Sequence, residues 1–179
     1  LLGVLDGSGL DEQRSSAIAT VANGSIDRAL LLASDNDALE RWTTWQQVRL
    51  TLDGSGNAVT QTADQLLAMV DDAAAPLQER QDRERDELDE RAERFGERGL
   101  GRRSLEDRHK REVRKLRTDE LAMGITAISI SIREDLETGR IDAGSALASL
   151  EAVTKAAENL RRNPNERLLL QRLFLNLNS

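Results

Sequence analysis

The side chains that most often carry chemistry are scarce in this sequence. His109 is the only histidine among the 179 residues, and cysteine is absent. One histidine cannot form the histidine pair of a zinc site, and without cysteine there is neither a thiolate ligand nor a thiol nucleophile. We therefore expect no catalytic residue and no metal site, and we interpret His109 as a residue of a helix seam.

Phosphate-binding motifs are missing as well. A phosphate-binding loop presents glycine backbone N–H groups before a helix and adds a lysine, but the pattern G-x-x-x-x-G-K-[ST] does not occur. The glycine clusters at 54–56 and 96–101 follow no predicted strand, so we interpret both as turns. No cofactor is expected.

The charged residues predict an antiparallel helical hairpin. Residues 78–95 carry eight acidic and five basic side chains (net −3), whereas residues 97–117 carry nine basic and four acidic ones (net +5). Opposite charges on two segments joined by a glycine-rich turn favour pairing. Each exposed ion pair contributes only about 0.2–1 kcal/mol, so the charges determine register more than stability. The helical spacing predicts a thin apolar seam formed by Leu88, Ala92, Phe95, Leu105, His109 and Val113.

The basic run at 108–117 does not by itself indicate a nucleic-acid site. It contains no Phe, Tyr or Trp side chain on which bases could stack. The formal net charge of the whole chain is −7, which opposes binding along a phosphate backbone. A solvated arm with its acidic partners across the turn is the favoured interpretation.

The composition predicts an all-α fold. Aromatic residues make up 2% of the chain and prolines number two, while Leu, Ala, Glu and Arg, which favour helices, dominate. No apolar run approaches the roughly 20 residues of a membrane span, and the start lacks the pattern of a signal peptide. We expect a cytoplasmic protein that makes no contact with membranes.

The apolar spacing predicts the helices that position the hairpin. The best core helix carries Leu121, Ile125, Ile128, Ile132 and Leu136 on one stripe and ends at Gly139. Trp42 and Trp45, three residues apart, should fill the core beside it. The other predicted helices cover 10–22, 25–34, Asp35 or Asp37 to Leu52, and 63–70, which Pro76 separates from the charged stretch.

Two helices complete the predicted body. Asp142 should cap a helix whose stripe is Ala146, Leu150, Val153, Ala157 and Leu160, and Pro164 should lie in the first turn of the last helix. That last helix is apolar on more sides than one core contact needs. The leucines predicted to form an assembly interface are Leu168, Leu169, Leu173, Leu175 and Leu177. Of these, Leu168 and Leu175 are predicted to face outward.

Three segments together resemble the AAA+ clamp-loader family. Residues 17–33, AIATVANGSIDRALLLA, look like the lid subdomain of clamp-loader subunits. Residues 149–177, SLEAVTKAAENLRRNPNERLLLQRLFLNL, resemble the last two collar helices, in which an Asn-rich break precedes a leucine-rich terminal helix. Residues 106–124, EDRHKREVRKLRTDELAMG, look like the charged arm and core helix of the delta-prime subunits of bacterial DNA polymerase III.

The resemblance implies a domain organisation and a set of partners. Residues 1–36 would be the end of an AAA+ lid, and residues 37–179 a helical-bundle collar domain with the charged hairpin. Such a collar assembles with the gamma or tau and delta subunits of the loader, and it meets the sliding clamp and primed DNA only through the assembled complex. The AAA+ domain that precedes the lid in this family would be missing from the chain.

One position separates the members of the family. In the ATP-hydrolysing gamma and tau subunits an arginine of the lid senses nucleotide, but here Asp27 follows Gly24-Ser25-Ile26 and Arg28 is displaced by one residue. One residue along a helix rotates a side chain by about 100°, which favours the non-hydrolysing delta-prime type. Two alternatives stay open: a gamma or tau fragment in which Arg28 contacts nucleotide, and a free-standing helical adaptor. The full-length gene would distinguish them.

We predict that this chain neither binds nor hydrolyses ATP, because it lacks a phosphate-binding loop and a sensor arginine in register. Titration calorimetry with ATP and magnesium should show no binding heat. Binding with a dissociation constant in the micromolar range would contradict the prediction.

Overall fold

The computed structural model describes residues 37–95 and 101–177 continuously, together with the isolated residues 15, 16, 18, 19, 26, 29 and 33. Every regular element in the two continuous ranges is a helix, which confirms the predicted all-α class. The short helices predicted for 10–22 and 25–34 lie largely outside the described residues, and so does Arg28. The helices are α4 (Ala38–Gln46), α5 (Val48–Thr51), α6 (Gly56–Phe95), α7 (Arg102–Glu137), α8 (Ala143–Leu160) and α9 (Glu166–Leu177).

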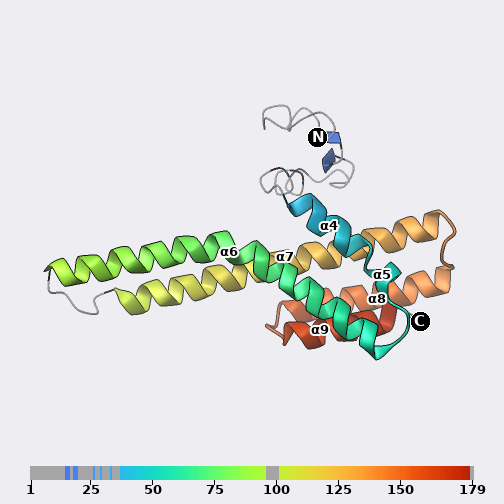
Figure 1. Ribbon diagram of the computed structural model, residues 1–179. Coiled ribbons are helices and arrows are strands. Elements are labelled where there is room, and N and C mark those ends of the chain that lie inside the picture. Colours follow the sequence, from blue (N-terminus) through green and yellow to red (C-terminus); the bar gives the residue numbers. More distant parts are fainter. Residues whose placement is uncertain are drawn as a thin grey trace.

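The helices form a body and a projecting arm (Figure 1). The body combines α4, α5, α8 and α9 with the first part of α6 and the second part of α7. The remaining parts of α6 and α7 run antiparallel away from the body and form the arm. The predicted hairpin is therefore present, and both of its helices continue into the body without a break.

The second part of α7 is the centre of the core. Leu121, Ile125, Ile128 and Ile132 of the predicted stripe are buried, but its last member, Leu136, is 39% exposed, so the prediction was wrong there. Trp42 and Trp45 of α4 are fully buried and belong to the same apolar cluster. Burying side chains of this size contributes about 1.5–3 kcal/mol each, so the body holds most of the stabilising contacts.

A glycine allows α4 to approach α7. Gly124 is buried in the middle of α7, and a Cβ atom added to it would overlap Cδ2 and Cε2 of the Trp45 indole ring. Because the ring is rigid and fully buried, it cannot move aside as the end of a flexible side chain would. The two-residue contact thus fixes how closely α4 packs on the core helix. Arg41 of α4 adds a bidentate ion pair with Glu120 of α7, at 3.0 and 3.1 Å.

The prediction that Pro76 ends a helix was wrong. α6 is a single helix of 40 residues with Pro76 inside it. Proline lacks an N–H and removes one intrahelical hydrogen bond, but its side chain here is exposed and the helix continues. Ala74 is the last buried residue of α6 before the arm, so the proline stands where α6 leaves the body. Figure 1 shows α6 changing direction between its body and arm parts, as a proline kink does.

Other boundaries differ by small amounts. The helix predicted from Asp35 or Asp37 to Leu52 is interrupted at Gln47, between α4 and α5. Pro164 precedes α9 instead of occupying its first turn, because Asn165 caps that helix by accepting a hydrogen bond from the backbone of Leu168 at 3.0 Å. On α8, Ala156 is buried in place of the predicted Ala157.

Two predicted helix ends are confirmed. Gly139 follows α7 with a φ of +71°, a conformation that glycine adopts without a steric penalty. Asp142 caps α8, since its side chain accepts hydrogen bonds from the backbone N–H groups of Gly144 and Ser145. These bonds lower the pKa of Asp142, and the side-chain hydrogen bond from Ser145 makes the largest contribution.

We predict that Gly124→Ala lowers the free energy of unfolding by about 1–3 kcal/mol, because the added methyl group overpacks the Trp45 contact. Gly56→Ala is the matched control: Gly56 begins α6, and a Cβ there meets no atom within 4 Å. The control should leave the stability unchanged or slightly higher. Urea unfolding followed by circular dichroism measures both, and equal effects of the two substitutions would contradict the packing argument.

Candidate interaction surfaces

The structure divides the predicted assembly interface of α9 into two groups. Leu169, Leu173 and Leu177 are buried within this chain, at 6%, 2% and 2% exposure, so they pack the core and are not available to a partner. Leu168 and Leu175, in contrast, are 63% and 58% exposed. The prediction is therefore corrected to these two outward leucines. The exposure of Leu168 and Leu175 confirms that they face outward, as predicted.

Contacts on both sides fix the orientation of α9. Arg167 pairs with Asp64 of α6 at 2.7 Å, and Gln171 donates a hydrogen bond to Thr60 of α6 at 3.4 Å. The other side of α9 packs on α8. A groove of about 260 Å³ lies between these two helices. What remains outward is a ridge formed by Leu168, Arg172 and Leu175, three residues that helical spacing places on one face. We call these three residues the α9 ridge.

Polar contacts, and not apolar ones, hold the arm at its middle. The seam contains a buried glutamine, Gln81, whose amide donates hydrogen bonds to the carbonyl oxygen of His109 at 3.3 Å and to Glu112 at 3.1 Å. His109 is also buried, and its Nε2 lies 2.9 Å from a carboxylate oxygen of Glu84. Arg108 pairs with the same carboxylate. The predicted position of His109 in the seam is thus confirmed.

The apolar part of the seam is thin, as its sequence predicts. Leu88, Ala92, Leu105 and Val113 are all only half-buried, and the side chain of Phe95 lies outside the described residues. Sequence reasoning missed Gln81, because an apolar pattern was sought. Its spacing was informative, since Gln81 precedes Leu88 by seven residues, the repeat of a two-helix seam.

One arginine ties the root of the arm to the body. Arg117 of α7 donates three hydrogen bonds to Glu166 at the start of α9, the shortest at 2.6 Å, and also pairs with Asp71 of α6. These carboxylates raise the pKa of Arg117, the hydrogen bond to Glu166 contributing most. Because Arg117 is about three-quarters buried, this contact is stronger than the exposed pairs further along the arm.

The described residues offer no metal site. No group of three or more histidine, cysteine, aspartate or glutamate side chains in that part of the chain is placed to hold an ion. Within the same residues, no helix is both long and apolar enough to cross a lipid bilayer. The features on which a function can be argued are therefore the surfaces of α9 and of the arm.

Comparison with known proteins identifies no relative of this chain. The chain matches no protein-family model, no curated protein and no solved structure. A function is therefore inferred from these surfaces and from the three sequence segments described above.

We predict that Glu84→Gln loosens the arm above all near neutral pH. The hydrogen bond from His109 is the largest of the contacts that lower the pKa of Glu84. A carboxylate whose pKa is lower in the folded state adds stability above its unfolded pKa, and this stability is lost as the pH falls through the folded value. Wild-type amide protection factors at Gln81 and His109, which correct for the intrinsic pH dependence of exchange, should therefore fall on acidification more than those of Glu84→Gln do.

The matched control is Glu90→Gln, on the same arm. Glu90 is exposed and forms no ion pair with another described residue. This control should retain the pH dependence of the wild type. If Glu84→Gln and Glu90→Gln show the same exchange profile, the Glu84–His109 contact does not hold the arm.

Proposed function

We propose that this chain is the assembly part of a clamp-loader subunit of the non-hydrolysing delta-prime type, acting in DNA replication in the cytoplasm. In this role it binds the gamma or tau and delta subunits, and it contributes to loading the sliding clamp on primed DNA only through the assembled loader. The chain supplies contacts between subunits and no chemistry of its own.

The α9 ridge is the observation that carries the proposal. It belongs to the segment that resembles the terminal collar helix of clamp-loader subunits, and it exposes two leucines on a helix whose other leucines are buried. Burial of a leucine contributes about 1.5–3 kcal/mol, so a partner that covers Leu168 and Leu175 gains a substantial part of an interface energy. The groove between α8 and α9 borders this ridge and enlarges the surface that a partner can contact.

A free-standing helical adaptor is the second candidate. The observation that favours it is the arm, which projects from the body and is not needed to complete the core. An adaptor of this kind would fold and bind its partner without other loader subunits. The two candidates differ in whether the α9 ridge or the arm is the principal contact.

We predict that Leu168→Asp combined with Leu175→Asp leaves the fold intact and abolishes incorporation into the loader. Both side chains are exposed, so the expected change in stability is within about 0.5 kcal/mol, whereas a charge in an apolar interface prevents its burial. Circular dichroism melting and co-purification with the other loader subunits measure the two effects separately.

The matched control is Leu50→Asp. Leu50 of α5 is 85% exposed and lies outside the ridge, so this variant should both fold and assemble. A ridge variant that co-purifies as well as the control would remove α9 from the interface and leave the adaptor as the better candidate.

A further inference from the structure

A groove lies at the root of the arm, separate from the α9 ridge. It has a volume of about 520 Å³ and is formed by three parts of the fold: α6, α7 and the turn that leads into α9. Most of its lining residues come from α7 and α6, and Asn163 and Glu166 lie at the end next to the body. The residues that line it are Gln81, Arg85, Glu106, His109, Lys110, Val113, Arg114, Arg117, Asn163 and Glu166.

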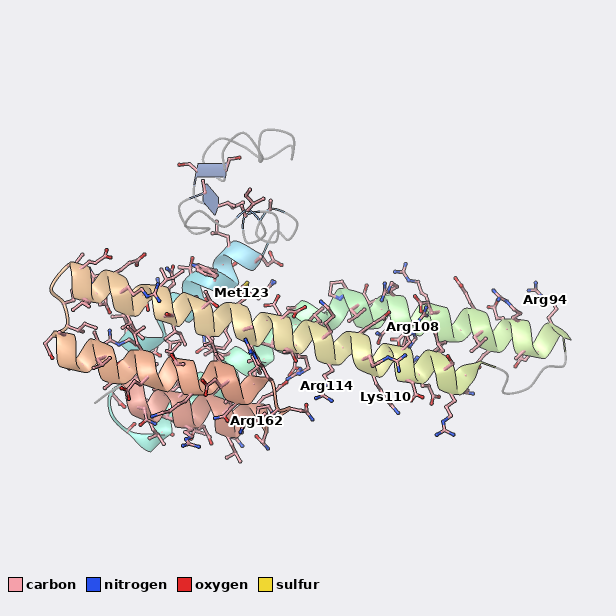
Figure 2. The ribbon with its side chains drawn as sticks, turned by 180° about the vertical axis from the view of Figure 1, so that it is seen from behind. Arg94, Arg108, Lys110, Arg114, Met123 and Arg162 are labelled. Carbon is pink, nitrogen blue, oxygen red and sulfur yellow. The ribbon has the colours of Figure 1, made fainter. Side chains whose placement is uncertain are left out.

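Two cations of this groove are not neutralised within the described part of the chain. Arg85 pairs with Asp82, and Arg117 pairs with Glu166 and Asp71. Lys110 and Arg114 are exposed, and neither forms an ion pair with another described residue. In Figure 2, Lys110 and Arg114 lie along the same edge of the molecule as Arg162, the exposed arginine that follows α8.

The same face of α7 is covered in the body and open in the arm. Lys110, Arg114, Arg117 and Leu121 follow one another at spacings of four, three and four, which is a single helical stripe. Leu121 is completely buried, Arg117 meets Glu166 at the first residue of α9, and the two cations beyond them are exposed. α9 therefore stops covering this face of α7 at Glu166, its first residue. The groove lies on the uncovered continuation of the same face.

We propose that this groove binds an acidic helical segment of a partner protein. A helix laid between α6 and α7 would place carboxylates against Lys110 and Arg114 and an apolar side chain against Val113, which is half-buried between them. The proposal does not depend on the α9 ridge and holds for either candidate function.

A protein fits this surface better than a nucleic acid does. Tight association with DNA neutralises on the order of 6–10 phosphates, whereas the groove supplies two unpaired cations and includes the carboxylates of Glu106 and Glu166. A short acidic helix needs fewer cations than a phosphate backbone does, because it ends within the groove.

The test is binding of a fluorescein-labelled amphipathic peptide of about four helical turns, with Glu on one face and Leu on the other. Fluorescence anisotropy gives its affinity, and amide chemical-shift changes give its position. The variants are Lys110→Glu combined with Arg114→Glu, and a control, Arg91→Glu combined with Arg111→Glu. The control has the same change in charge, and its two arginines are exposed and line a separate groove.

We expect the peptide to shift the amides of Lys110, Val113 and Arg114. We expect the groove variant to weaken binding at least about tenfold and the control to change it by less than about twofold. Binding should weaken as salt rises, since the contacts are partly exposed ion pairs. If the groove variant melts below the wild type, Lys110→Gln combined with Arg114→Gln replaces it.

Three results would overturn the proposal. Equal loss of affinity in the groove variant and the control would show attraction by overall charge and no specific groove. Tighter binding of a DNA oligonucleotide than of the peptide, at the same salt and with the same shifted amides, would make the surface a nucleic-acid site. Concentration-dependent dimerisation of the wild type that protects these amides and is lost in the groove variant would make a second copy of the chain the occupant.

Discussion

The contact between Trp45 and Gly124 is the constraint on which the body of this protein depends. Because Gly124 has no Cβ, the indole ring of α4 lies directly against the backbone of α7, and both residues are removed from solvent. The ion pair of Arg41 with Glu120, one turn before Gly124 on α7, then fixes α4 along the core helix. With α4 held on α7, the stripe of Leu121, Ile125, Ile128 and Ile132 on α7 is buried, and α8 packs on the same helix.

The core helix also determines where the arm points. Since α7 runs without interruption from Arg102 to Glu137, the direction that packing gives to its second part carries over to its first part. The two parts are stabilised differently, by buried apolar area in the body and by hydrogen bonds and ion pairs around Gln81 and His109 in the arm. Few buried apolar contacts give a segment low local stability, so we expect the arm to open more readily than the body.

The sequence predicted those features that depend on apolar periodicity or on a cap. The buried stripe from Leu121 to Ile132, the hairpin and the cap at Asp142 are examples. It did not predict the continuity of α6 through Pro76. A proline in a helix costs about 3 kcal/mol, and tertiary packing of the helix before and after the proline can offset that cost. A local sequence pattern does not contain this packing.

The candidate surface was predictable in outline only. Leucines cover most of the circumference of α9, and which of them are exposed is decided by the neighbours: α6 meets Arg167 and Gln171, and α8 covers Leu169 and Leu173. These contacts explain why Leu168 and Leu175, the predicted outward pair, are exposed. The groove at the root of the arm was hidden for the same reason, because Glu166 lies about 50 residues along the chain from Arg117, with which it pairs.

The central claim is that the α9 ridge contacts other subunits while the rest of α9 completes the core. Site-specific photo-crosslinking within the assembled loader tests it most directly, with a photoreactive amino acid placed in turn at Leu168, Leu175 and Leu50. All three positions are well exposed in this chain, so each substitution should preserve the fold. The account predicts crosslinks to neighbouring loader subunits from Leu168 and Leu175 and none from Leu50, and crosslinks from Leu50 without any from the ridge would contradict it.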